Sequence, residues 1–571
     1  MPIAGKIGNE IGGVFACYLC IAVMFLLKHN IYELISVQYY LITIIIPIFL
    51  LFFLMPHCKG TIEISHVDAL LIILFVWVFI HSIVTGVSID NISKFGILGL
   101  FYILCKCCYK KTINLEIIIL PFLVVSGIES VLFLLQYFIG GADTVMPSGT
   151  LGNSARLCGV LMMLTPFCIL MFKSSNNVFK KIYATIFILN NSVIILAFSR
   201  AAIIALLIAY IYLAYKNNYI RFSKKYIILC VVVVCLILSL LVVLKYDSVV
   251  GRLLIWKITL LQLYPNFLLG KGIDSFIPLY NNAQSLYFAK KIGVFDKESS
   301  VAGFVAYPYN EILNTLVELG LIPCIIVVVI IYILLKTKTE STVGIYLKSI
   351  ILATLVFSMF SYTSKVYLML VVFTICIAVL DVSNSEKKAV VVLSLNSVIK
   401  YVCAAFLLFI IFFQSLSLVK YIECGQVHEC FASGRSSMAL NDCEKYVKRF
   451  SKSYIIMAEY GKILYDEAEF DKCTEVLDRV ANRFPDPKIL VLQARAYMKI
   501  NEYGKAEQLL IKASNMVPSK FEAKYWLFKL YQKTNMERAM VVAKIISQQP
   551  VKITSDYVMK VKQEVSDFLK F

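Results

Sequence analysis

The chain has 571 residues, of which 60% are hydrophobic and 13% aromatic, and its mean hydropathy is +0.80. Apolar runs of about 17 to 25 residues, each long enough to cross a hydrocarbon core of roughly 30 Å, recur through the first 420 residues and exclude a soluble globular protein. The formal charge of +19 comes largely from lysines in short loops between these runs, where they orient helices, so nucleic acid is not expected as a partner.

We predict an all-α fold, a polytopic transmembrane bundle of about 12–13 spans followed by a soluble α-helical repeat domain. The transmembrane domain is expected over 1–420, with a large outward loop at 245–309, and the repeats over 430–571. The first apolar run is kept as a span because no small-residue cleavage site follows Leu27. The predicted spans are 11–28, 37–55, 66–84, 92–105, 113–138, 154–172, 179–197, 200–215, 226–244, 310–335, 343–360, 365–380 and 398–419.

Lysines gather in alternate connections between the predicted spans, and the other connections are nearly free of them. Examples of the lysine-rich connections are those at 106–111, 173–181 and 336–338. Because cytoplasmic loops are enriched in Lys and Arg, the N-terminus is expected in the cytoplasm. An odd number of crossings then places the C-terminal tail on the extracytoplasmic side.

Cysteine is abundant, but most of the 17 cysteines lie inside apolar runs, where they behave as small hydrophobic side chains. Cys105, Cys107 and Cys108 form a C-x-C-C cluster that lacks a second ligand pair and a nearby histidine. We expect no metal and no cofactor.

Arginine is scarce before residue 420, and Arg156, Arg200 and Arg252 all fall at predicted helix ends on the outward side. The guanidinium group offers a fixed fork of donors that suits phosphate, whereas lysine is a mobile point charge. Three outward arginines therefore predict an anionic ligand such as a pyrophosphate. The alternative is that each arginine reaches to lipid headgroups.

The surrounding sequence indicates how these arginines are presented. The turn-rich connection 140–153 delivers Asn153 and Arg156 to the start of a span, and only F-S-R-A-A separates the two spans that flank Arg200. Residues 252–264 have the apolar pattern of a helix lying on or partly in the membrane. The G-K-G at 270–272 lacks the spacing of a phosphate loop and is interpreted as a turn.

Two acidic residues lie within predicted spans, where ionisable groups are costly and often functional. Glu318 sits about two turns into the span at 310–335, and Glu129 lies within the span at 113–138. A structural role is favoured for Glu129. No histidine lies near the arginines in the sequence.

The tail changes abruptly to charged, helix-forming sequence with internal repetition. Pro485, Pro518 and Pro550 recur about every 33 residues, close to the period of about 34 residues of tetratricopeptide repeats. Small and aromatic residues such as Ala494 and Tyr497 occupy positions that resemble the same family. A short array of helical hairpins is a scaffold or binding surface, so a protein partner of the tail is expected.

Several motifs together resemble the O-antigen ligase and polymerase family, which also includes bacterial protein O-oligosaccharyltransferases. The resemblance covers roughly residues 90–380. It is carried by G-T-L-G-N-S at 149–154, S-R-A at 199–201, G-R-L-L-I-W at 251–256, P-N-F-L-L-G-K-G-I-D-S-F at 265–276 and Y-N-E-I-L-N-T-L-V-E-L-G-L at 309–321.

The resemblance implies a metal-independent glycosyltransferase of the bacterial inner membrane. Such an enzyme takes a glycan from an undecaprenyl-pyrophosphate carrier on the outer face and transfers it to an acceptor hydroxyl of a glycan, lipid or protein. The family's two key arginines match Arg200 and Arg252. Alternatives are an O-antigen or capsule polymerase, a protein O-oligosaccharyltransferase, and a non-enzymatic transporter of lipid-linked or anionic solute.

The sequence departs from many ligases at 309–310, where Tyr-Asn replaces His-Asn. An unperturbed tyrosine, with a pKa of about 10, is a poor base near neutral pH. Either Glu311 or Glu318 accepts the proton, or stabilisation of the leaving group dominates and Tyr309 only orients the acceptor. The expected catalytic residues are Arg200, Arg252, Tyr309, Asn310 and Glu318, and the expected substrate-binding residues are Asn153, Arg156 and Glu311.

Overall fold

The chain is an all-α membrane protein, as predicted, with one pair of short strands among the residues that the structure describes. Five of the described helices are long and apolar enough to cross a membrane by length and composition, and shorter apolar helices accompany them. The computed structural model describes residues 18–23, 37–57, 61–86, 89–110, 115–140, 147–219, 246–264, 267–291, 295–338, 341–384, 390–394, 397–432, 444, 447–450, 453–552 and 554–570.

Two compact units make up the chain. The first contains residues 1–235, 309–315 and 319–421, and the second contains residues 236–308, 316–318 and 422–571. The long loop between the apolar runs therefore belongs to the same unit as the C-terminal helices. Each unit is described separately below.

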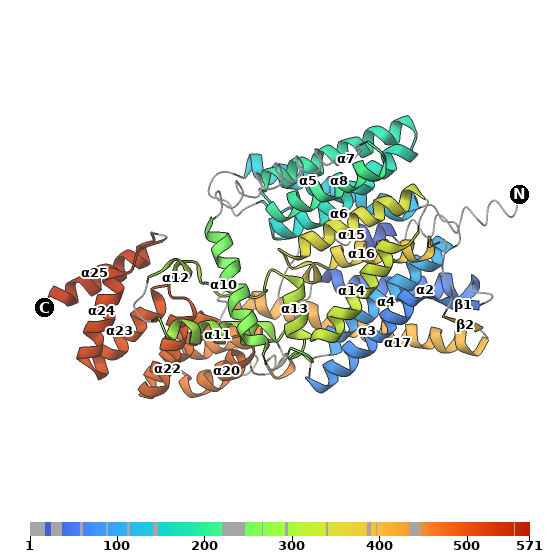
Figure 1. Cartoon of the computed structure of the whole chain (residues 1–571). Helices are drawn as coiled ribbons and strands as arrows, with labels where there is room; N and C mark the ends of the chain where they lie inside the picture. Colours follow the sequence, from blue (N-terminus) through green and yellow to red (C-terminus); the bar gives the residue numbers. More distant parts are fainter. Residues whose placement is uncertain are drawn as a thin grey trace, which may run out of the picture. The chain divides into compact units, whose positions relative to one another are not determined.

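Helices of the first unit run side by side, and most of them lie close to the predicted spans (Figure 1). The predicted span 226–244 and most of the span 11–28 lie outside the described residues. The helices that lie wholly or mostly in this unit are α2 (Val37–His57), α3 (His66–Val84), α4 (Ile89–Lys110), α5 (Leu115–Ile139), α6 (Ser154–Ser174), α7 (Asn177–Leu196), α8 (Arg200–Lys216), α13 (Glu311–Glu318), α14 (Leu321–Lys336), α15 (Thr342–Ser358), α16 (Tyr367–Val382) and α17 (Ser397–Ala432).

The centre of this unit is α6, whose side chains are buried almost continuously from Leu157 to Met171. Gly159 of α6 faces Phe357 and Met369 so closely that a Cβ there would approach Phe357 to 2.9 Å. Since small residues let membrane helices approach closely, Gly159 allows α15 and α16 to pack against α6.

One predicted span is broken, because the expected helix over 310–335 is divided into α13 and α14. Gly320 has φ of 87°, a left-handed conformation that glycine adopts without steric cost. The break frees the Leu319 carbonyl, which accepts a hydrogen bond of 3.2 Å from the Trp77 indole of α3. A free carbonyl at membrane depth is costly, so Trp77 stabilises this break.

The sequence predicts Lys106 in a cytoplasmic loop, but α4 extends past this residue to Lys110. Its ammonium group pairs with Asp68 of α3 and, at 2.7 Å, with Asp381 of α16. The Tyr102 hydroxyl donates to the same two carboxylates, at 2.8 and 3.3 Å. Charges inside a bundle are tolerated when they are paired in this way. The cluster joins three helices at the end of α16 remote from Tyr367.

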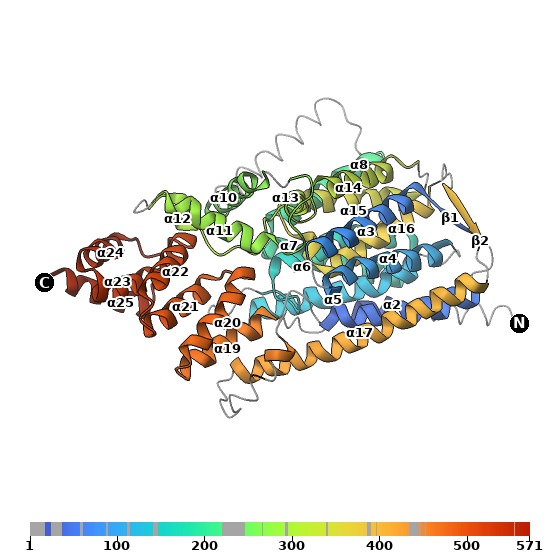
Figure 2. The same ribbon diagram turned by 90° about the horizontal axis from the view of Figure 1, so that it is seen from below.

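The strands were not predicted, and each has only four residues. β1 (Thr61–Ile64) pairs antiparallel with β2 (Val391–Ser394), and Thr61 lies opposite Ser394 (Figure 2). β1 leads into the capping box of α3, in which Ser65 and Asp68 each bond the other's backbone N–H. The last helix of this group, α17, continues thirteen residues beyond the predicted end at 419.

The second unit combines the helices of the long loop with those of the tail. Helix α11 of the loop packs on α22 of the tail. The loop helices are α10 (Tyr246–Leu263), α11 (Phe276–Ala289) and α12 (Lys297–Val301). The tail helices are α19 (Tyr454–Asp466), α20 (Phe470–Arg483), α21 (Pro487–Lys499), α22 (Tyr503–Met516), α23 (Glu522–Thr534), α24 (Met536–Gln548) and α25 (Asp556–Lys570).

The tail helices form successive antiparallel hairpins. Each of the three recurring prolines, Pro485, Pro518 and Pro550, lies shortly after the second helix of a hairpin. Gly461 of α19 has no room for a side chain because Leu477 of α20 packs directly against it. A helical-hairpin array is therefore observed over the described tail. Its assignment to the tetratricopeptide family stays a prediction.

Candidate functional site

The head of α13 holds the Tyr-Asn-Glu segment singled out in the sequence. Asn310 caps this helix, because its Oδ1 accepts hydrogen bonds from the backbone of Ile312 and Leu313 at 3.0 and 3.1 Å. Tyr309 has φ of 53°, an uncommon conformation for a bulky residue. Such backbone strain gathers at ligand sites when the surrounding structure enforces it.

Tyr362, which follows α15, brings Tyr309 and Arg156 together. The Tyr309 and Tyr362 rings meet edge to face, with centroids 5.6 Å apart, and the Arg156 guanidinium carbon lies 5.9 Å from the centre of the Tyr362 ring. Arg156 Nε is buried and has no hydrogen-bond partner among the described residues. A buried donor without a partner is costly, and a ligand oxygen would satisfy it.

Glu311 ties the head of α13 to the turn between α15 and α16. Its Oε1 accepts a hydrogen bond of 2.7 Å from the backbone N–H of Ser364, within the short 3-10 helix Thr363–Lys365. Asn310 also reaches this turn, because its Nδ2 donates to the Met359 carbonyl at 3.4 Å. The two side chains therefore hold the site's backbone in place, and their contact with substrate stays a prediction.

The connection before α6 is fixed by two side chains of α5. Glu129 is buried and accepts hydrogen bonds from the backbone N–H of Thr150, at 3.0 Å, and from the Thr150 hydroxyl. Gln136 accepts from the N–H groups of Ser148 and Gly149, each at 2.9 Å. The favoured structural role of Glu129 agrees with these contacts.

Asn153 ends this connection and caps α6. Its Oδ1 accepts from the N–H groups of Ala155 and Arg156 at 2.8 and 3.4 Å. Arg156 therefore stands in the first turn of a helix whose start is fixed from both sides. Helix N-termini favour anionic ligands, and here the arginine adds a full positive charge.

Arg200 opens α8 directly after a tight turn, as the sequence predicted. α7 ends at Leu196, and Phe198 takes φ of 49° so that the chain can reverse within a few residues. Ser199 caps neither helix through its side chain but lies against the Cys158 thiol of α6. Arg156 and Arg200 thus extend from helices that pack together in the first unit.

Arg252 lies in α10 of the second unit, so its meeting with Arg200 stays a prediction. The predicted amphipathic helix over 252–264 is confirmed as a helix, but it begins six residues earlier. Trp256, one turn after Arg252, donates a hydrogen bond of 3.0 Å to the carbonyl of Pro308. This bond ties the Arg252 helix to the residue that precedes Tyr309 in the chain.

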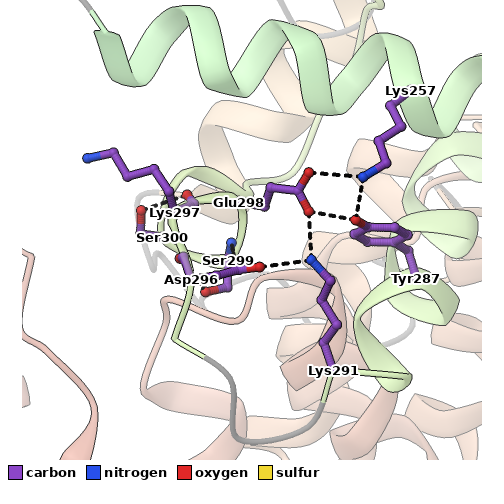
Figure 3. Close-up of polar contacts among 8 residues, drawn as sticks. All are labelled: Lys257, Tyr287, Lys291, Asp296, Lys297, Glu298, Ser299 and Ser300. Carbon is purple, nitrogen blue, oxygen red and sulfur yellow. Dashed lines mark hydrogen bonds and ion pairs between the residues drawn. The ribbon is translucent and has the colours of Figure 1, made fainter.

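An ionic cluster joins the three loop helices, as Figure 3 shows. Glu298 of α12 accepts from the Lys257 ammonium of α10 at 3.1 Å, and from the Tyr287 hydroxyl and Lys291 ammonium of α11 at 2.6 and 2.8 Å. Burial favours the neutral acid, but these donors hold the pKa of Glu298 below its usual value. Asp296 accepts a further bond from Lys291. The cluster joins α10 to α11 through Lys257, one turn and a half after Arg252 in the same helix.

Glu318 ends α13 instead of lying inside a longer helix. The G-K-G segment satisfies this helix end, because the N–H groups of Lys271 and Gly272 donate to the carbonyls of Val317 and Glu318 at 2.8 and 2.9 Å. The last carbonyls of a helix need such partners. The segment is therefore a turn that caps α13, and Glu318 is buried.

The sequence did not single out Tyr362 or Ser364. The sequence around them gives only a weak signal, because S-Y-T-S-K is a short polar connection between two spans, on the side predicted to face outward. Only the packing of α6, α13 and the turn around Thr363 shows that these residues share one place. No group of three potential metal ligands gathers among the described residues.

Comparison with known families supports the resemblance found in the motifs. Residues 183–326 match the family model described as O-antigen ligase. The matched segment begins within α7, ends within α14, and includes Arg200, Arg252 and the head of α13. No curated protein matches the chain. The chain is thus a multi-pass helical membrane protein whose matched segment is similar to ligase-type or polymerase-type membrane glycosyltransferases.

Proposed function

We propose that the protein transfers a glycan from an undecaprenyl-pyrophosphate carrier to an acceptor hydroxyl at the outer face of a bacterial inner membrane. The match of residues 183–326 to O-antigen ligases supports the general class. The observation that carries the proposal is Arg156, whose buried Nε has no hydrogen-bond partner among the described residues and whose guanidinium lies over Tyr362, the residue that also contacts Tyr309. An anionic oxygen is the partner that this donor would take.

Arginine side chains bind the pyrophosphate leaving group and stabilise its charge in this mechanism. As the acceptor oxygen attacks the anomeric carbon, the bond from that carbon to the phosphate oxygen breaks and negative charge grows on the pyrophosphate. Arg200 and Arg252 stabilise this charge, and Arg156 holds the donor in place. Preorganised cationic donors act most strongly on charge that develops in the transition state.

The acceptor hydroxyl does not need a strong general base, because the pyrophosphate is a good leaving group. Tyr309 orients the acceptor hydroxyl, with its ring fixed on Tyr362. Glu311 is less suited to be the base, because its Oε1 already accepts a hydrogen bond from the backbone N–H of Ser364. Glu318 is then the candidate that accepts the proton, two turns further along the same helix.

The test is the pair of substitutions Arg200→Lys and Arg252→Lys in protein reconstituted with a lipid-linked glycan. Lysine keeps the charge but loses the forked donor geometry, so we expect transfer to fall roughly a hundredfold or more for each. Arg479→Lys is the matched control, because Arg479 forms an exposed pair with Glu475 within α20 of the tail. Near-normal transfer by both site variants would refute the mechanism.

The same reconstitution separates transfer from transport. A transporter would move labelled lipid-linked or anionic solute across the liposome without forming a new glycosidic bond. The acceptor class is then assigned in a deletion strain. Shortened polysaccharide chains indicate a polymerase, loss of capped lipid core indicates a ligase, and loss of glycoprotein indicates a protein O-oligosaccharyltransferase.

A further inference from the structure

The long loop and the tail share a buried polar interface within the second unit. Gln284 of α11 is fully buried, and its Nε2 donates to the carbonyl of Met516 at 2.6 Å and to that of Gly303 at 2.8 Å. The neighbouring Ser285 hydroxyl donates to the Lys512 carbonyl at 3.0 Å. Met516 and Lys512 belong to the last turns of α22, so the loop helix satisfies carbonyls at the end of a tail helix.

The segment that leads to Tyr309 is held by the same interface. Phe304 packs against the core of the tail and meets the Phe484 ring edge to face, with centroids 5.0 Å apart. Asn281 of α11 exchanges two hydrogen bonds with the backbone of Val305, at 2.8 and 3.1 Å. The tail therefore contacts both α11 and the extended chain that follows α12.

The contacts continue from α11 to the helix that carries Arg252. Tyr287 and Lys291 on α11 and Lys257 on α10 all bond Glu298 (Figure 3). Trp256 of α10 in turn donates to Pro308. An unbroken series of polar contacts thus runs from the end of α22 to the first turns of α10.

We propose that the C-terminal helical array is a brace for the loop, in which Gln284 is a positioning residue that fixes α10 and its Arg252. The array's partner is then a part of its own chain. Energetically, Gln284 suits this task because loss of its amide would leave the Met516 and Gly303 carbonyls without that donor in a buried place. A displacement of about 1 Å in a catalytic group commonly costs on the order of a hundredfold in rate.

The test compares Gln284→Met with Gln493→Met in the full-length protein. Gln493 is a matched control, because it is also fully buried but bonds Asp478 inside the array, at 2.6 Å. Hydrogen exchange is measured across α10 and α11. We expect exchange there to rise about tenfold or more in Gln284→Met and to stay unchanged in Gln493→Met. Unchanged exchange in Gln284→Met, or an equal rise in both variants, would overturn the brace.

A kinetic measurement on the same variants rests on the proposed function. Transfer by Gln284→Met should show kcat lowered roughly ten- to hundredfold with little change in KM for the acceptor, whereas Gln493→Met should retain both. The two proposals fail separately. Loss of the exchange effect refutes the brace, whereas near-normal transfer by Arg200→Lys and Arg252→Lys refutes only the assigned chemistry.

Discussion

At the scale of single residues, the connection before α6 depends on a glycine with no room for a side chain. Gly149 has φ of 61°, and a Cβ at this position would collide with the carboxylate of Glu129. That carboxylate is held by two bonds to Thr150 and lies in the bundle interior. Neither the backbone nor the acid can move without breaking these bonds.

We therefore expect Gly149→Ala to destabilise the protein and to weaken binding of the lipid-linked donor. Gly152→Ala is the control, because Gly152 also has a positive φ, of 69°, but nothing lies within 4 Å of its Cβ position. The control should cost only the left-handed conformation, about 1–2 kcal/mol, and Gly149→Ala should cost roughly 1–3 kcal/mol more. Thermal unfolding in detergent measures both, and equal losses would contradict the clash.

Two of the residues with an uncommon backbone conformation lie beside predicted site residues. Phe198 and Tyr309 both have positive φ values, and they lie two residues before Arg200 and one before Asn310. Their types gave no warning, since neither residue favours this conformation. The tight turn at Arg200 could be predicted from the missing loop, but the conformation of Tyr309 could not, because it depends on Asn310 capping α13 and on packing against Tyr362.

At the scale of elements, the tail contains a buried ammonium group whose charge opposes folding. Lys524 of α23 donates to the Pro518 carbonyl and to Oε1 of Gln549, and burial lowers its pKa from the ordinary 10.5 to about 8. Between these two values the unfolded chain binds more protons at this position than the folded chain does. The stability contributed by this group is therefore lowest below pH 8 and rises as the pH increases through 8 toward 10.5.

The free energy of unfolding, measured by chemical denaturation, should show this rise between pH 7.5 and 9.5. Its slope with pH should correspond to at most about one proton per molecule. Lys524→Met removes the titrating group and should flatten the profile over the same range. A profile that falls with pH in the natural chain, or one that keeps its slope in Lys524→Met, would contradict the assignment to this lysine.

An interruption in one predicted helix decides where Glu318 lies. The apolar run at 310–335 predicted one helix by length, yet Gly320 divides it and places Glu318 at a helix end. Glycine inside an apolar run is compatible with a continuous helix, so composition alone did not decide this position. The Trp77 indole, which satisfies the Leu319 carbonyl, comes from a helix more than two hundred residues earlier.

At the scale of the whole chain, the shared unit of loop and tail bears on topology. Four apolar helical crossings separate the loop from the tail when α13 and α14 count as one: 311–336, 342–358, 367–382 and 397–432. An even number of crossings returns the chain to the side from which it started. The membership of loop and tail in one unit agrees with this parity.

We expect epitope tags placed beside Tyr264 and at the C-terminus to be reached by antibody from the same side of the membrane in intact spheroplasts. Tyr264 is 86% exposed and lies at the end of α10, so a tag there should leave the helices folded. A tag at Ser341, one crossing beyond the loop, should be protected until the membrane is opened. Opposite accessibility of the first two tags would show that a crossing has been miscounted.

The sequence by itself determined the helical class and most of the described helices of the bundle, and it predicts an outward placement for the scarce arginines. Each of these follows from local rules: the length of an apolar run, the side on which lysines gather and the spacing of prolines. The match of residues 183–326 to O-antigen ligases agrees with the motifs found in this way. The helical-hairpin array of the tail also followed from its repeat.

Only the tertiary structure decided which distant residues meet. The contact of Arg156 with Tyr362, the Lys106 cluster with Asp68 and Asp381, and the docking of Gln284 on α22 each join segments far apart in the chain. Such contacts carry no periodic signal, because they depend on how helix faces pack after each helix has formed. The sequence assigned the loop to the transmembrane domain for that reason, whereas the buried amide of Gln284 shows that the loop folds against the tail.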